Sequence, residues 1–272
     1  QADAALSSKI LKTVNSSFYG LPQPCSSISQ ALVILGLNAV KTLALGFTLV
    51  SRLKVSEDSQ FDPFDFWRRS LYTAVGAKVI AQQIEMLQYE EAFLGGLLQD
   101  MGMFVLYAQD DAERQQWLGR AQGQHRKLRA IEQQAMDMDH AQIGAKLAER
   151  WGLPALLVTP IQFHETPSGA PSEVTSLVRC VAVGNDVADL MTSGTPEKWL
   201  SLYRRHCREW FDLPAAVADG LLDDMHRMLG PMRSLLDIPT GEFADVDTVM
   251  AKANEALGQL ALKQQIEAGE LA

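Results

Sequence analysis

Apolar residues recur every three or four positions along nearly the whole chain, which is the spacing of an amphipathic helix. Leu6, Ile10, Leu11 and Val14 are the first example, and comparable stripes continue into the C-terminal region. A strand would need apolar and polar residues to alternate over four or more positions, and such alternation is hard to find. The pattern therefore predicts an all-α protein.

Capping residues and helix breakers mark the ends of several predicted helices. Ser27 to Gln30 has the pattern of a capping box and begins a helix that should end at Gly36. Asp62 followed by Pro63 favours a second start, because the Asp side chain can cap free amides and Pro fits the first turn. This helix should run to about Leu87. Further helices are expected near residues 89–107, 126–136, 141–151, 154–163 and 172–191.

A flexible stretch from Thr192 to Pro196 divides the chain. We therefore expect a helical domain over residues 1–192 and a helical extension over residues 193–272. The extension should contain a helical block from Glu197 to Leu236 and a terminal helix from Val246 to Gln265. The chain opens directly in a helical pattern without an initiator Met, which indicates a segment of a longer protein.

Composition places the chain among soluble globular proteins. It has 272 residues, of which 47% are apolar, and this is enough to build a core. No apolar run reaches the roughly 20 residues of a membrane span, so no membrane association is expected. Cys25, Cys180 and Cys207 are far apart and form no Cys-x-x-Cys pair, which is typical of a protein in a reducing cytoplasm.

A net charge of -9 argues against nucleic-acid binding. The local basic run His125–Arg129 is interpreted as a solvated helix face, because no glycine-rich loop or interleaved aromatic residue accompanies it. The chain also lacks a Gly-x-Ser-x-Gly elbow, a P-loop and a dinucleotide-binding fingerprint. The sequence therefore predicts neither a nucleophilic serine nor a nucleotide cofactor.

Several ordered segments carry a resemblance to a known family. They are Ser7–Gly20, Ile28–Val40, Phe66–Leu71, Gly95–Gly102, Ile143–Leu147 with Trp151–Pro154, and Ile161–His164. Together they resemble the HDOD family, a regulatory branch of the HD superfamily of metal-dependent phosphohydrolases. The resemblance covers about residues 1–192 and implies an HD-like multi-helix domain.

The resemblance also implies where a metal centre would lie. In catalytic relatives this centre draws on a first His, a His-Asp pair, later histidines and a final Asp. Here Arg69 stands at the position of the first His, and Gln99 replaces the His of the pair. Four positions keep a residue of the ligand type, namely Asp100, His140, His164 and Asp186.

Arg69 and Gln99 weigh against a metal ion. A guanidinium stays protonated, only donates and repels a divalent cation, and a neutral amide is a poor replacement for an imidazole. Arg69 can instead neutralise Asp100 or Asp186 in a buried cluster. His140 and His164 also have structural explanations, as residues at helix ends. We therefore expect a degenerate site with no metal, no cofactor and no catalysis.

The implied function is regulatory. HDOD modules occur in bacterial signalling proteins beside receiver, kinase or GGDEF diguanylate cyclase domains, and Val246–Leu260 is similar to a helix that often precedes a GGDEF domain. We expect a module whose pocket binds a small anion or a protein partner and controls an attached output domain. The alternative is a divalent-metal phosphohydrolase with a remodelled site, in which Asp100, His140, His164 and Asp186 bind the metal.

Overall fold

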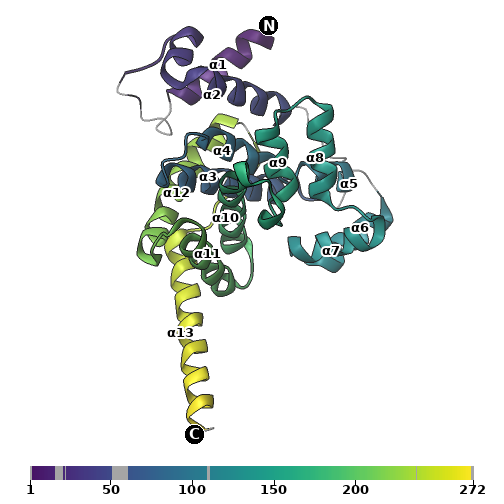
Figure 1. Cartoon of the computed structure of the whole chain (residues 1–272), viewed down its shortest axis with the longest axis vertical. Coiled ribbons are helices and arrows are strands. Elements are labelled where there is room, and N and C mark those ends of the chain that lie inside the picture. Colours follow the sequence, from purple (N-terminus) through teal and green to yellow (C-terminus); the bar gives the residue numbers. More distant parts are fainter. Residues whose placement is uncertain are drawn as a thin grey trace.

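The structure is a computed structural model that describes residues 2–15, 21, 23–50, 61–108, 111–236 and 238–270. These residues form thirteen α-helices and two 3₁₀ helices, and no strand occurs among them, which confirms the all-α prediction. The helices are α1 (Ala2–Val14), α2 (Ile28–Val50), α3 (Pro63–Gln83), α4 (Tyr89–Leu98), α5 (Met101–Tyr107), α6 (Ala112–Ala121), α7 (His125–Met136), α8 (His140–Arg150), α9 (Ala155–Phe163), η1 (Pro167–Gly169), η2 (Ser172–Val174), α10 (Thr175–Thr192), α11 (Pro196–Phe211), α12 (Ala215–Leu236) and α13 (Val246–Glu270) (Figure 1).

The helix starts are better predicted than the breaks. Asp62 caps α3 as expected, since its side chain accepts from two backbone amides of the first turn. In α2 the backbone is non-helical at Gly36, with φ at 84°, but helix resumes at once beyond it. The predicted helix over residues 89–107 is wrong, because the chain turns at Gln99 and Asp100 and separates α4 from α5.

Helices α3 and α10 pack against each other at the centre of the protein (Figure 1). Their backbones nearly touch. A Cβ atom added to Gly184 would lie 2.2 Å from the carbonyl oxygen of Thr73, and one added to Gly76 would lie 3.0 Å from the Cα atom of Gly184. This approach brings polar side chains of the two helices within reach of each other.

The other helices surround this pair. Helix α4 packs on α3 and α10, α9 packs on α4, and α8 packs on α5 and α9. Helices α11 and α12 pack on α10 and α3, and their buried apolar side chains belong to the same core. The predicted boundary at residue 192 stays a prediction. Among the described helices, none is long and apolar enough to span a membrane.

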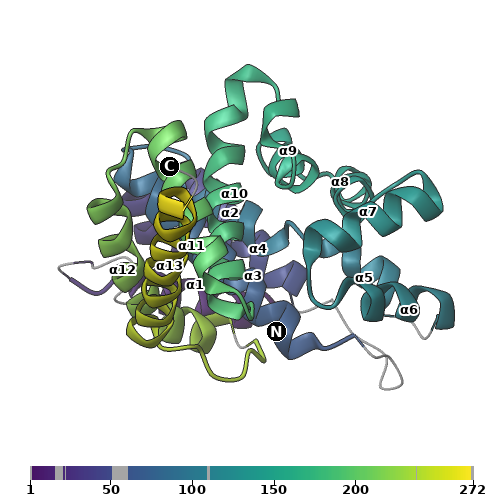
Figure 2. The ribbon, with the colours of Figure 1, turned by 90° about the horizontal axis from the view of Figure 1, so that it is seen from below.

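Two parts extend beyond the core. Helix α13 projects from the body (Figure 1), and its first turns pack on α11, where Arg204 donates to Asn254 at 3.1 Å. Its side chains from Gly258 to Ile266 are exposed. The α6–α7 hairpin lies at the periphery on the opposite side of the molecule from α12 (Figure 2).

Candidate functional site

The break between α4 and α5 places Gln99 and Asp100 in the interior, where they are 0% and 1% exposed. Asp100 directly precedes α5, and α5 packs closely on α8. A Cβ atom added to Gly102 would lie 2.0 Å from the backbone oxygen of His140. This contact brings Asp100 beside the first residue of α8.

Three ligand-type side chains converge at this point. Asp100 Oδ1 lies 3.5 Å from His140 Nε2 and 3.3 Å from His164 Nε2. One donor atom from each residue lies within 4.8 Å of the other two, and all three residues are buried. None of these three atoms has a hydrogen-bond partner among the described residues. Three of the six predicted site residues, Asp100, His140 and His164, therefore direct possible metal-ligand atoms toward one point.

Hydrogen bonds behind the two imidazole rings fix their orientation. His140 Nδ1 lies 2.7 Å from Glu132 Oε2, and the Tyr107 hydroxyl donates to the other oxygen of Glu132 at 2.6 Å. His164 Nδ1 lies 2.9 Å from the carbonyl oxygen of Ile161, which can only accept, so this nitrogen carries a proton. Both Nε2 atoms are thereby directed at the carboxylate, which is the usual arrangement behind a metal-binding His.

The groups at the centre shift one another's pKa values. Burial by itself raises the pKa of Asp100, but the imidazoles of His125, His164 and His140 around it hold it well below its ordinary value. Burial and the charge of Arg69 also lower the pKa of His125 well below its ordinary value, so the positive charge beside Asp100 comes more from His140 than from His125. Burial lowers the pKa of His140, whereas the hydrogen bond and charge of Glu132 raise it, and the result is a pKa of about 9. The polypeptide alone therefore holds an ionised carboxylate against a protonated imidazole.

Arg69 and Gln99 cover the other oxygen of Asp100. Arg69 donates to Asp189 Oδ1 at 2.5 Å and also to Asn185, and its Nε atom lies 3.9 Å from Asp100 Oδ2. The Gln99 amide donates to Asp100 Oδ2 at 3.1 Å and to Asn185 at 3.0 Å. The two residues that stand in place of histidines thus form one hydrogen-bonded layer.

Asp186 is not part of this layer, so the predicted cluster of Arg69 with Asp186 is wrong. Asp186 Oδ2 lies 2.5 Å from His206 Nδ1 on α11, and Asp189 takes the place beside Arg69. Asn185 and Asp189 are four residues apart and share one face of α10, whereas Asp186 is turned by about 100° from Asn185. The family motif predicts that Asp186 lies on this helix, but it does not determine which face of α10 the residue occupies.

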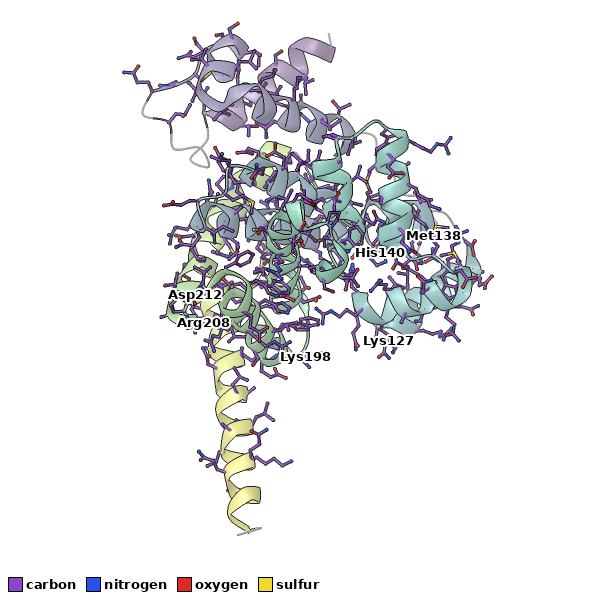
Figure 3. All side chains as sticks on the ribbon, in the orientation of Figure 1. Lys127, Met138, His140, Lys198, Arg208 and Asp212 are labelled. Atoms are coloured by element: carbon purple, nitrogen blue, oxygen red, sulfur yellow. The ribbon has the colours of Figure 1, made fainter. Side chains whose placement is uncertain are left out.

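The basic run His125–Arg129 is only partly the solvated face that its composition predicts. His125 Nδ1 lies 3.8 Å from Asp100 Oδ2, and its ring stands edge-on to that of His140 with centroids 5.9 Å apart. Lys127 is exposed, as predicted, and Figure 3 shows it on the side of α7 away from His140. The interpretation failed because carboxylates from other helices face this side of α7.

Sequence reasoning also missed Glu132, Asn185 and Asp189. The spacing of Asn185 and Asp189, four apart in a segment whose only other charged residue is Asp186, is a signal that could have found them. Glu132 carries no comparable signal, because a Glu in a polar helix is ordinarily exposed.

The three converging donors fit one divalent metal ion. Bonds of about 2.0 to 2.2 Å place neighbouring ligand atoms roughly 3 Å or slightly more apart, close to the distances from Asp100 Oδ1 to the two imidazoles. Imidazole and carboxylate donors suit iron, manganese or zinc. The guanidinium of Arg69, near the second carboxylate oxygen, opposes such an ion.

Known proteins resemble the chain in sequence and in fold. The HDOD domain family model matches residues 1–167. An uncharacterized protein of Treponema pallidum (strain Nichols) is 29% identical over 196 residues, which is 71% of this chain. The match covers 37% of that relative, so the chain spans well under half of its length.

Three solved structures share the fold. An HDOD domain protein of unknown function from Geobacter sulfurreducens matches 95% of this chain and 80% of its own, with a TM-score of 0.59 and 21% identity. For a candidate phosphohydrolase from Shewanella amazonensis, the match covers 95% of this chain and 81% of that protein's chain, with a TM-score of 0.56 and 24% identity. For a candidate signal transduction protein from Marinobacter aquaeolei, the match covers 87% of this chain and 53% of that protein's chain, with a TM-score of 0.62 and 21% identity.

Proposed function

The chain belongs to the HDOD domain family, and we propose that it is a regulatory signalling module that does not hydrolyse phosphate esters. Arg69 is the observation that carries the proposal. The residue is 7% exposed, and its guanidinium is fixed by Asp189 and Asn185 beside the Asp100 carboxylate. Two unit charges 4 Å apart repel by about 4 kcal/mol at an effective dielectric of 20, so the guanidinium weakens any cation bound nearby.

A small anion is the ligand that we propose for this module. A cavity of about 360 Å³ is lined by Arg68, Arg69 and His125 among other residues. It has room for a phosphate-sized molecule. Two of the residues that line it, Arg69 and His125, have a buried nitrogen, Nε and Nδ1 respectively, without a hydrogen-bond partner among the described residues. Asp62 and Asp65 also line the cavity, so we expect modest affinity.

We propose that helix α13 connects the module to the protein that it regulates. This protein is either a domain attached to the same chain, such as a GGDEF diguanylate cyclase, or a separate partner. The helix projects from the body, and Leu260, Leu262 and Ile266 are about half exposed on it. Apolar side chains on a projecting helix favour contact with further protein. A cyclase domain joined after Ala272 should change its rate when Arg69 is replaced by Lys, and an equal rate would contradict the connection.

A divalent-metal phosphohydrolase is the second candidate. It is favoured by the convergence of Asp100 Oδ1, His140 Nε2 and His164 Nε2, three atoms without a hydrogen-bond partner among the described residues. These residues would hold the ion, which supplies Lewis acidity toward a phosphoryl oxygen. In this case Glu132 would hold the His140 ring in place through its Nδ1 atom, and Arg69 would face the negative charge of the substrate.

Metal titration combined with a turnover assay separates the two candidates. The purified chain should be stripped with a chelator, reloaded with Mn²⁺, Fe²⁺ or Zn²⁺, and assayed with p-nitrophenyl phosphate and bis(p-nitrophenyl) phosphate. The regulatory proposal expects no turnover above the metal-containing buffer, even where an ion binds. Turnover that is lost in Asp100→Asn would overturn it and support the hydrolase.

A further inference from the structure

The N-terminal end of α7 lies between two cavities. The cavity of about 360 Å³ is lined by Gly123 and His125, by several residues of α3, and by single residues of α5, α6 and α10. A second cavity of about 270 Å³ lies between Arg126 and Arg129 of α7 on one side and residues of α10, of α11 and of the segment after α9 on the other, with His164 in its lining. This end of α7 is therefore not closely packed against the protein body.

Side chains bridge the space that the backbone leaves open. Arg126 lies 3.7 Å from Glu165 Oε2 and 3.7 Å from Asp186 Oδ1, and its guanidinium lies 5.5 Å from the centre of the Trp199 ring. His125 reaches Asp100 at 3.8 Å. The Arg126 side chain is 54% exposed and its distances exceed those of hydrogen bonds, so these contacts are weak and sensitive to salt.

The first turn of α7 is also electrostatically unfavourable. It contains His125, Arg126 and Lys127 and no acidic residue, although the N-terminus of a helix favours negative charge. Gln124 occupies the N-cap position and forms no side-chain cap. Both features lower the free energy needed to unwind or displace this turn.

The far end of α7 is held differently. Glu132 is fully buried and bonds to both the ring and the backbone nitrogen of His140, while Tyr107 donates to its other oxygen. Buried, charge-assisted bonds of this kind are stronger than exposed ion pairs. The helix is therefore held firmly from Arg129, which donates to Asp139 at 2.6 Å, to Glu132, and weakly near His125.

We propose that the first turns of α7 are a movable lid over the Asp100 centre and that Arg126 is its latch. When the lid opens, His125 leaves Asp100, the two cavities join, and the Nε2 atoms of His140 and His164 become reachable from solvent. A latch whose Arg126 side chain is 54% exposed can release and close again without loss of the core. The proposal is independent of whether the centre binds a metal ion.

Replacing the latch tests the proposal. In Arg126→Ala, amide hydrogen exchange over residues 124–129 should be about five- to tenfold faster than in the parent, because two ion pairs and a cation–π contact are lost. Modification of His164 at Nε2 by diethyl pyrocarbonate should accelerate by a similar factor. Arg126→Lys keeps the positive charge, so its exchange and modification rates should lie between those of the parent and of Arg126→Ala. In 1 M salt, where the screening length is about 3 Å, the parent should approach the alanine variant.

Lys127→Ala is the matched control, because Lys127 is exposed on the same turn and forms no ion pair with a described residue. It should exchange no faster than the parent, because removing a cation from the first turn of a helix does not destabilise that turn. Equal exchange and modification rates in Arg126→Ala and the parent would overturn the proposal, as would an equal effect of Lys127→Ala. Faster exchange spread through α3 and α10 would also overturn it, since that result means general destabilisation.

Discussion

Arg69 shows how one residue can reassign a site without changing the fold around it. Arg69 lies on helix α3, where its guanidinium donates to Asp189 and Asn185 and lies farther from Asp100. Burial by itself would lower the pKa of Arg69, but the carboxylates of Asp189 and Asp100 raise it, so the side chain remains a cation. The protein thus has a permanent positive charge where the resemblance places a metal-ligating His.

Removing this charge should destabilise the protein strongly. We expect Arg69→Ala to lower the free energy of unfolding by roughly 3–5 kcal/mol, because Asp189 is left buried without its partner. Urea unfolding at pH 7 measures the change. Arg68→Ala is the control, since Arg68 pairs on the surface with Asp65 and should cost less than about 1 kcal/mol. Equal losses in the two variants would mean that Arg69 is not a buried partner.

At the scale of the elements, the sequence identified most helices but neither the break before α5 nor the face of α10. Apolar residues continue through Gln99 and Asp100, so the periodicity resembles one helix where the structure has two. On α10, Asn185 and Asp186 differ by one position and face different neighbours. Which face is buried depends on α3 and α11, and a pattern within one helix does not contain that information.

The contact between α5 and α8 should depend on a glycine. We expect Gly102→Ala to cost about 3 kcal/mol, because the new Cβ atom would lie 2.0 Å from the His140 backbone oxygen and must push the helices apart. Gly119→Ala is the opposite case. It is exposed on α6 with no atom near its added Cβ, so it should stabilise by about 0.5–1 kcal/mol. Thermal unfolding of both variants checks the signs, and a neutral Gly102→Ala would contradict the close packing.

The contact between α3 and α4 contains a buried ion pair and should give a pH dependence. Burial lowers the pKa of Lys78 to about 8, although Glu90 at 2.7 Å opposes the shift. Between pH 8 and about 10.5 the unfolded chain binds more protons at this group, so stability should rise with pH by up to about 3 kcal/mol. Below pH 8 the group is charged in both states and adds no slope.

The double variant Lys78→Met with Glu90→Gln isolates this contribution. Urea unfolding of the parent and the variant at pH 7, 8, 9 and 10 gives the difference between them as a function of pH, in which exposed lysines cancel. The parent should gain stability relative to the variant above pH 8. A constant difference across the range would mean that the pKa of Lys78 is the same in the folded and unfolded states.

At the scale of the whole molecule, the fold class followed from helical periodicity, because that signal is repeated in nearly every segment. The candidate site did not follow completely. Asp100, His140 and His164 meet, as their order in the family motifs implies, but His125 and Asp189 come from helices whose contacts lie far away in sequence. Long-range packing decides such contacts, and one sequence does not show it.

The same packing argues that the C-terminal helices are needed for folding. Seven side chains of α11 and α12 that are larger than alanine are at most 2% exposed, and these are Leu200, Tyr203, Cys207, Leu222, Met225, Leu229 and Met232. Burying each contributes roughly 1.5–3 kcal/mol, and their sum is comparable to the usual 5–15 kcal/mol stability of a domain.

We therefore expect a chain of residues 1–192 to lack a cooperative thermal transition by circular dichroism. A chain ending at Leu257 should unfold within a few degrees of the parent, because residues 258–266 are exposed. Cooperative unfolding of residues 1–192 near the parent temperature would show instead that the boundary at 192 separates an independent domain, and that α11 and α12 cover a core already complete without them.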